Sequence, residues 1–233
     1  MTSGMRRRMG VEQRREQLIA VAQELFSHRS PEDVSIDEIA EAAGISRPLV
    51  YHYFPGKQSL YEAAIQRAAQ ELTARFQEPQ EGPLGARLLR VMERFFDFVD
   101  DHGPGFSALM RGGPAVSSGK TGAIIEEVRQ AAYEEILRHL GIVHAAPRVE
   151  LLVRSWVSHA ETTALLWLDG RRVPRAELER QLVHEFAALA AVAAAYDEEM
   201  AELLRRIFAT EPSDSPFAEL ITRIAALLPL PAP

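Results

Sequence analysis

The side chains best equipped to bind another molecule lie together between positions 46 and 57. Arg47, Tyr51, His52, Tyr53 and Lys57 carry hydrogen-bond donors and fall within about three helical turns of one another. Basic and aromatic groups at this spacing suit a phosphate-lined groove of nucleic acid better than open water. Arg47 can form two parallel hydrogen bonds with a guanine in the major groove. The chemistry predicted for this stretch is recognition rather than catalysis.

Two short helices joined by a tight turn are needed to present these groups. Ser35 followed by Glu38 three residues later forms a capping box, which predicts the start of a helix. Gly44 favours the left-handed backbone that ends a helix. Ser46 can cap a second helix, which tolerates Pro48 in its first turn. The pattern predicts a helix-turn-helix in which residues 46–53 form the recognition helix.

An ordinary helical hairpin buried in a core is the alternative interpretation of this stretch. Ile36, Ile39 and Ala43 recur at helical spacing and predict one buried face on the first helix. On the second helix, Val50 and Phe54 serve as anchors, while the opposite side is polar. A helix this short, with one polar side, is poorly suited to burial in a core, so we favour the helix-turn-helix.

The segment from Arg14 to Leu60 resembles the DNA-binding domain of TetR-family transcriptional regulators. Three runs of sequence carry the resemblance: LIAVAQELF, VSIDEIAEAAGIS and VYHYFPGKQSLYEA. The most specific part is the tract from Tyr51 to Leu60, whereas Ser30 departs from the glycine that the family usually has there. The resemblance implies an all-α protein with an N-terminal three-helix domain, followed by a larger helical domain for ligand binding and dimerisation.

The resemblance also implies roles for individual residues. The family places base-reading side chains at the positions of Ser46, Arg47 and Leu49. Phosphate contacts fall at the positions of Tyr51, His52 and Lys57, and at Ser35 on the preceding helix, while the position of Tyr53 varies between base and backbone contact. The predicted DNA-binding residues are Ser35, Ser46, Arg47, Pro48, Leu49, Tyr51, His52, Tyr53 and Lys57.

Composition limits the class of protein. The 233 residues suffice for a small N-terminal domain and one larger helical domain. The absence of cysteine excludes disulfides, thiolate metal sites and cysteine nucleophiles, and it fits a cytoplasmic location. No apolar run approaches the roughly 20 residues of a membrane span, so no membrane partner is expected.

Charge is unevenly distributed along the chain. The net charge is −7, yet residues 1–15 contain five arginines against Glu12 alone. Residues 58–233 account for the whole acidic excess, so only the N-terminal end suits DNA. Arg6, Arg7 and Arg8 lie in a basic arm of residues 1–10. Two interpretations of the arm stay open, a solvated tail or a flexible segment that contacts phosphates or the minor groove.

The remaining chain is predicted to be wholly helical. The first domain is predicted to span residues 1–57, with a helix over residues 11–28, and the second to span residues 58–233. Pro79 to Pro83, with Gly82 between, is predicted to mark the domain linker region. The expected helices after the recognition helix are 57–77, 84–102, 106–111, 123–140, 147–169, 174–196, 198–208 and 217–228.

Two long apolar helices, 147–169 and 174–196, are predicted to form a homodimer interface. The second contains seven alanines between positions 187 and 195, whose small side chains permit close helix approach. The resemblance implies a four-helix interface from the equivalent pair, and core packing within one chain is the alternative. A two-fold dimer would bind a palindromic operator in double-stranded DNA.

The larger domain is also predicted to hold a small hydrophobic ligand, as regulators of this kind usually do. Glycine and proline breaks beside Phe106 and Met110 suggest a mobile apolar wall, and plain core packing is the alternative for each residue. The predicted ligand-binding residues are Met92, Phe95, Phe96, Val99, Phe106, Leu109, Met110, Tyr133, Trp156, His159, Thr163 and Trp167. Arg154, Glu161 and Thr162 are further polar candidates on the same helix as His159.

An enzymatic function is not predicted, and neither is a cofactor or a metal. The sequence lacks a glycine-rich phosphate loop, a nucleophile elbow and a paired-histidine metal helix. His139 and His144 straddle Gly141, so they do not share a helical face as zinc ligands would. The prediction is a dimeric DNA-binding regulator, a repressor released by a hydrophobic ligand. The alternatives are a regulator without a small-molecule ligand, and a helical binding or enzymatic protein with a vestigial motif.

Overall fold

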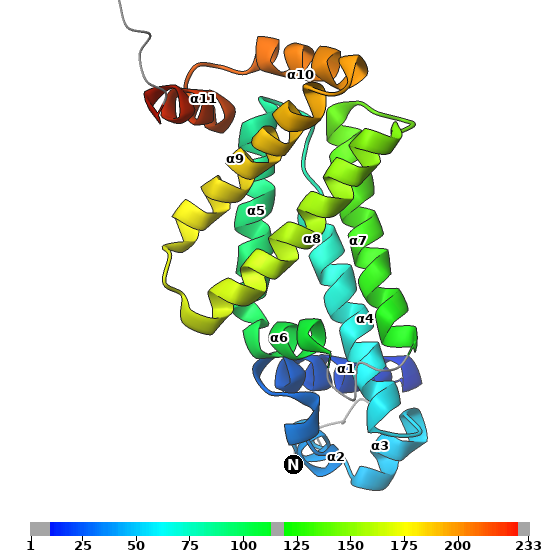
Figure 1. Cartoon of the computed structure of the whole chain (residues 1–233). Coiled ribbons are helices and arrows are strands. Elements are labelled where there is room, and N and C mark those ends of the chain that lie inside the picture. The colour runs from blue at the N-terminus through cyan, green and yellow to red at the C-terminus, as the bar shows by residue number, and fades with distance from the viewer. Residues whose placement is uncertain (1–9, 113–118, 228–233) are drawn as a thin grey trace, which may run out of the picture. The chain divides into compact units, whose positions relative to one another are not determined.

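A computed structural model describes residues 10–112 and 119–227 (Figure 1). Over these residues the chain is all-α, as predicted, with eleven α-helices, one 3-10 helix and no strand. The basic arm falls largely on residues 1–9, outside the described part. The elements are α1 (Val11–His28), η1 (Pro31–Asp33), α2 (Ile36–Ala42), α3 (Arg47–Tyr53), α4 (Lys57–Phe76), α5 (Leu84–Asp101), α6 (Gly103–Arg111), α7 (Gly119–Leu140), α8 (Pro147–Gly170), α9 (Arg175–Ala194), α10 (Glu198–Thr210) and α11 (Pro216–Leu227).

The chain forms two compact units. The first contains residues 1–71 and 101–125, and the second contains residues 72–100 and 126–233. The predicted domains, 1–57 and 58–233, stay a prediction. What the structure adds is that α6 and the start of α7 pack with the N-terminal helices.

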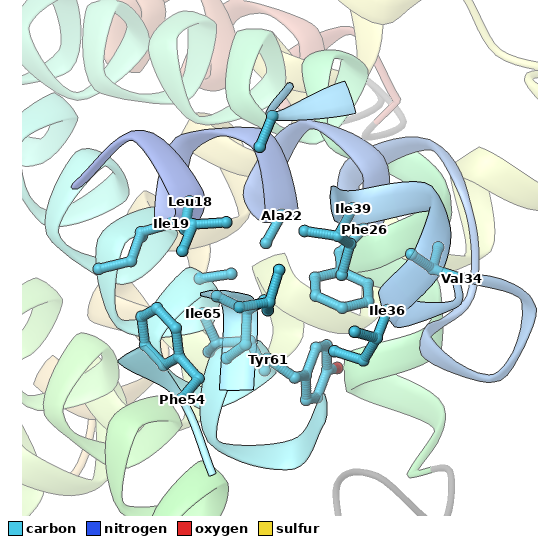
Figure 2. Packing of buried hydrophobic residues seen from close by; sticks show 14 of the residues in the cluster. Leu18, Ile19, Ala22, Phe26, Val34, Ile36, Ile39, Phe54, Tyr61 and Ile65 are labelled. Carbon is cyan, nitrogen blue, oxygen red and sulfur yellow. The ribbon is translucent and has the colours of Figure 1, made fainter. Parts of the chain in front are cut away.

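A single apolar core holds the first unit together (Figure 2). Leu18 and Ala22 of α1, Ile39 of α2 and Val50 of α3 are completely buried in it. Phe26 and Tyr61 meet edge to face, with ring centroids 5.0 Å apart. Burying a large apolar side chain stabilises a fold by about 1.5–3 kcal/mol. This core therefore fixes the positions of α2 and α3 without using their exposed faces.

Helix α6 lies directly against α1 within the first unit. A Cβ atom added at Gly105 would lie only 2.4 Å from the Phe26 carbonyl oxygen, so glycine permits the close approach. His102 Nδ1 lies 2.5 Å from Ser27 Oγ next to this contact. The Gly103-Pro104-Gly105 run, predicted to interrupt the chain, instead begins α6. Its proline occupies the first turn, where a missing N–H is tolerated.

Helix α7 starts at Gly119, four residues earlier than predicted. Its first turn is held by tertiary contacts that could not be predicted from the sequence. Lys120 Nζ lies 3.2 Å from Glu62 Oε2, and the neighbouring Thr121 is completely buried. These contacts offset the low helix propensity of Gly119 and Gly122.

The second unit has an aromatic core and polar contacts between its helices. Phe96 of α5 meets Trp167 of α8 edge to face at 5.4 Å, and Trp156 meets Phe186 of α9 at 5.2 Å. Arg175 at the start of α9 contacts Asp100 on α5 at 3.1 Å. No described helix is long and apolar enough to cross a membrane.

Candidate nucleic-acid interface

The start of α2 is fixed by the predicted capping box. Glu38 N–H donates to Ser35 Oγ at 3.2 Å, and Ser35 N–H donates to Glu38 Oε2 at 2.7 Å. The Glu38 carboxylate also accepts a hydrogen bond from Arg29 at 2.7 Å. The bond from Arg29, followed by those from Ser35, lowers the pKa of Glu38 to about 2. Two orphan N–H groups at this helix end are thereby satisfied.

The turn between α2 and α3 follows from Gly44. Its φ of +65° lies in the left-handed region, which glycine enters without a Cβ clash. Ile45 N–H donates back to the Ala40 carbonyl at 3.0 Å, which is the bond of a Schellman helix end. Ile45 then packs partly into the core. From α1, Gln17 Nε2 donates to the Ala43 carbonyl at 3.3 Å and ties the turn to the first helix.

Helix α3 has one buried and one exposed side. Val50 is buried, and Phe54 just after the helix is buried beside it. Tyr51 and His52 are exposed. Ser46 has the extended backbone of an N-cap, but its side chain makes no capping hydrogen bond, so that part of the prediction was wrong. Pro48 at N2 has no N–H to be capped, and the N–H of Leu49 at N3 donates to the Ser46 carbonyl oxygen at 2.9 Å, so the helix begins without a side-chain cap.

Arg47 is held across the exposed side. Its Nη1 donates to Asp37 Oδ2 at 2.9 Å, and its Nη2 donates to the Tyr51 hydroxyl at 3.4 Å. The guanidinium also lies 5.7 Å from the centre of the Tyr51 ring. Tyr51 first, and then Asp37, raises the pKa of Arg47. Asp37 was not among the predicted site residues, because it reads in the sequence only as an acidic residue in the first turn of α2.

Lys57 is engaged inside the protein. Its Nζ donates to the carbonyl oxygens of Pro31 at 2.8 Å and Val34 at 3.1 Å, which fastens the loop before α2 to the start of α4. An ammonium group has three N–H donors, so one remains for a phosphate. The phosphate role of Lys57 stays a prediction, and a structural role is added to it.

The other predicted residues vary in exposure. Ser35, Ser46 and Pro48 are exposed, whereas Leu49 and Tyr53 are half-buried. Tyr53 packs against the core and meets His52 edge to face at 5.3 Å. The predicted residues therefore gather on α3 and at the starts of α2 and α4, with Tyr53 and Lys57 partly committed to the fold. Arg15 of α1, 5.2 Å from the Phe54 ring, is a neighbouring cation that was not predicted.

Comparison with known proteins adds to this geometry. The family model described as "Bacterial regulatory proteins, tetR family" matches residues 18–64. A second, described as "Tetracyclin repressor-like, C-terminal domain", matches residues 84–189. The crystal structure of a tetR-family transcriptional regulator from Streptomyces coelicolor is 71% identical, covers 94% of this chain and 99% of its own, and superposes with a TM-score of 0.91. The chain belongs to the TetR family.

More distant relatives of this TetR-family protein share its plan. The HTH-type transcriptional activator FasR of Mycolicibacterium smegmatis is 29% identical over 171 residues, which cover 71% of this chain and 77% of FasR. A TetR-like transcriptional regulator from Rhodococcus sp. RHA1 is 26% identical, with a TM-score of 0.58 over 77% of this chain and 96% of its own. The protein is therefore a DNA-binding transcriptional regulator of a non-enzymatic family. The alternative of an enzymatic protein with a vestigial motif was wrong.

The residues predicted to line a ligand pocket in this TetR-family regulator are divided between the two units. Phe106, Leu109 and Met110 belong to the first unit, where Leu109 packs against the helix-turn-helix core. The second unit contains Met92, Phe95, Phe96, Val99, Tyr133, Trp156, His159, Thr163 and Trp167. Among the described residues, no group of three or more histidine, aspartate and glutamate side chains is arranged to hold a metal.

Several members of this ligand set are core residues of the second unit. Phe96 is fully buried, and Trp156 is 2% exposed and donates its Nε1 hydrogen to the Leu182 carbonyl at 3.0 Å. His159 is exposed, and its Nε2 lies 2.7 Å from a carboxylate oxygen of Glu185 on α9. A ligand-binding role for these residues stays a prediction.

Proposed function

We propose that this TetR-family protein acts as a homodimer that binds a palindromic operator, represses the adjoining gene and leaves the DNA when a small hydrophobic ligand binds. One observation carries the DNA-binding part. The exposed side of α3 presents Arg47, Tyr51 and His52 while Val50 holds the helix to the core from behind. A helix anchored in this way can enter the major groove without disturbing the fold.

Arg47 is the proposed reader of a base. Its guanidinium has five donors, and the contacts with Asp37 and Tyr51 use only part of them. Ser46 and Leu49 flank it, while Tyr51, His52, Ser35 and Lys57 are proposed to contact phosphates. Arg47→Ala should cost about 1–3 kcal/mol and relax preference at one base pair of each half-site. An equal loss on every sequence would instead make Arg47 a phosphate contact.

The dimer is proposed to form through α8 and α9. Both helices bury one face in their own unit, yet Leu151 and Leu166 of α8 and Val192 of α9 are 69%, 66% and 60% exposed. Ala187 and Ala190 belong to the core of the second unit, so the alternative of core packing accounts for part of the alanine run. The exposed leucine and valine side chains support a partner surface, because packing against a second copy would remove them from water.

Dimerisation bears directly on DNA binding. One helix-turn-helix module buries too little surface for tight specific binding, and two modules related by a two-fold axis bind two half-sites. The half-sites should lie about one helical turn apart, or a multiple of it. A ligand that favours a different separation of the recognition helices would weaken binding to such an operator.

Two alternatives concern how the protein regulates transcription: the sign of regulation and the presence of a small-molecule ligand. FasR is named an activator, which favours activation as a second possibility for the sign of regulation. A regulator whose second unit only dimerises or binds a protein partner is the other. Transcription in vitro from a promoter carrying the operator separates repression from activation, because the transcript falls in the first case and rises in the second.

Native mass spectrometry of the freshly purified protein, repeated after denaturation, tests the assembly. The proposal predicts a dimer mass, and a small molecule released on denaturation would be a candidate inducer. A dimer without extra mass would favour the regulator without a ligand. A monomer at micromolar concentration would refute both the proposed dimer interface and the palindromic operator.

A further inference from the structure

The outer faces of α8 and α9 in the second unit carry little charge. Between Leu151 and Leu166, the exposed residues of α8 are Leu151, Ser155, Ser158, His159, Thr162 and Leu166. On α9, one sector at helical spacing is formed by Gln181, Glu185, Leu189 and Val192. Charged residues make up 25% of the whole chain, yet His159 and Glu185 are the only ionisable members of these two sets. Depletion of charge is typical of the centre of a protein–protein interface.

His159 and Glu185 are paired with each other across the two helices. His159 Nε2 lies 2.7 Å from Glu185 Oε2, and the two side chains remain 47% and 32% exposed. Gln181 Nε2 donates to the other carboxylate oxygen, Oε1, at 2.8 Å. Because an ionised carboxylate only accepts hydrogen bonds, His159 Nε2 carries the hydrogen of this bond. The pair is therefore formed and oriented within one protomer.

Both members of the pair have bonding capacity left for a second copy. His159 Nδ1 makes no hydrogen bond to any of the residues that the structure describes, and a protonated imidazole donates from both ring nitrogens. A carboxylate offers about four lone-pair sites, and on Glu185 the bonds from His159 and Gln181 occupy two. One further donor and one further acceptor thus face outward from this surface.

The pair lies midway along the exposed face of α8. His159 follows Leu151 by about 12 Å of helix and precedes Leu166 by about 10 Å. In a two-fold dimer each patch meets the same patch of the other copy, and the middle of the patch lies nearest the axis. A dimer formed through α8 and α9 therefore brings the pair of one copy close to the pair of the other.

A two-fold axis allows two arrangements of neighbouring pairs. Either like groups face each other across the axis, or the histidine of each copy faces the glutamate of the other. The first arrangement brings two carboxylates together, and like charges at an interface oppose association. The second gives each imidazolium a carboxylate from both copies, with charge-assisted hydrogen bonds. The second arrangement is therefore the favourable one.

We propose that His159 and Glu185 select a second copy of this chain as the partner of α8 and α9. Each His159 donates its Nε2 hydrogen to Glu185 of its own chain and its Nδ1 hydrogen to Glu185 of the partner subunit. A helical partner without the complementary pair would bury these groups without bonds, which lowers affinity. The inference rests on the proposed dimer and deepens it, because it names the residues that discriminate between partners.

A chain with the pair reversed tests this selection. The double variant His159→Glu with Glu185→Lys exchanges the two charges, so it should form homodimers within about threefold of the wild-type affinity. A mixed dimer with wild type would instead place carboxylate against carboxylate and cation against cation. Mixed dimers should therefore make up less than about one fifth of all dimers, against about one half for random pairing, which is at least about a fourfold preference. Native mass spectrometry of tagged and untagged chains counts the three species.

An exposed ion pair on α10 provides the matched control. Glu202→Arg with Arg205→Glu reverses this pair outside α8 and α9, and the variant should mix with wild type at random. If the double variant on α8 and α9 forms no homodimer, its two single substitutions decide. His159→Glu and Glu185→Lys should each dimerise at least about tenfold more weakly alone than when mixed with each other.

Leu166→Glu separates this inference from the proposed function. The substitution puts a charge into the exposed face of α8 without touching the pair, and it should weaken the dimer at least about tenfold. A dimer that Leu166→Glu leaves intact would refute the interface through α8 and α9 itself. If Leu166→Glu weakens the dimer but the double variant mixes with wild type at random, the interface stands and selection by His159 and Glu185 is refuted.

Discussion

Replacing Asp37 with asparagine tests what its ion pair with Arg47 does at the surface proposed to bind DNA. The two side chains are 65% and 55% exposed and meet at 2.9 Å. An ion pair this exposed contributes at most about 1 kcal/mol to folding. Asp37→Asn should therefore melt within about 5 °C of the wild-type protein. Its effect should be seen in DNA binding instead.

On DNA the substitution acts on two quantities in opposite directions. A carboxylate about 7 Å from a phosphate is repelled by about 0.6 kcal/mol in water before salt screening, so its removal should tighten nonspecific binding about two- to threefold. The same change frees Arg47, whose ordering on a guanine then costs up to about 1 kcal/mol of side-chain entropy. The lost repulsion tightens specific binding as well, so specific binding should weaken only about twofold on balance. The ratio of specific to nonspecific affinity should therefore fall up to about fivefold.

Fluorescence anisotropy with an operator duplex and a scrambled duplex of equal length measures that ratio. Glu41→Gln is the matched control, because it removes one negative charge from the exposed side of α2 without touching Arg47. The control should tighten both duplexes alike and leave the ratio unchanged. If Asp37→Asn behaves like Glu41→Gln, Asp37 contributes only charge, and the positioning role assigned to it is refuted.

Four further substitutions test other contacts. Lys57→Ala removes the two hydrogen bonds to backbone carbonyls, so it should lower the free energy of unfolding by about 1–3 kcal/mol and weaken binding to all DNA sequences alike. Gly105→Ala places a Cβ against the Phe26 carbonyl oxygen and should destabilise the protein by about 1–3 kcal/mol. Gly122→Ala lies inside α7, meets nothing within 4 Å and should stabilise the protein by about 0.5–1 kcal/mol. Glu38→Gln should be less stable than the wild-type protein above about pH 4.5. This difference should shrink as the pH falls to about 2, because folding lowers the pKa of Glu38 from 4.5 to about 2.

Chemical denaturation at several pH values and anisotropy titrations check these expectations. Sequence-selective loss in Lys57→Ala would contradict a phosphate contact. Equal stability of the two alanine variants would show that α6 does not need glycine to approach α1. If the stability difference between wild type and Glu38→Gln does not change with pH, the ionised Glu38 carboxylate does not stabilise the start of α2.

Local sequence signals predicted the helix-turn-helix well. The Ser35–Glu38 capping box and the left-handed Gly44 depend on residues three or four positions apart, and both occur in the structure. Helix α1 has the predicted bounds because one apolar stripe defines it. The Ser46 cap was wrong, because the side chain of a good capping residue can turn elsewhere without moving the backbone.

The contacts between residues far apart in the chain could not be predicted from the sequence. The start of α7 depends on Lys120 meeting Glu62, and the beginning of α6 depends on Gly105 meeting α1. The pair formed by Asp37 and Arg47 joins two helices across the turn, and no spacing rule points to it. A small apolar cavity in the second unit, lined from α5, α7, α8, α9, α10 and α11, likewise arises from residues spread between positions 84 and 217.

Selection of bound duplexes from a random-sequence pool, run in parallel with wild-type protein and Arg47→Ala, tests the central claim most directly. The claim is that two copies of α3 read a two-fold symmetric site through Arg47. Wild type should enrich a palindrome with a guanine at one symmetric position in each half-site, and the variant should lose preference at that position only. Enrichment of an asymmetric site, or the same preference with and without Arg47, would contradict it.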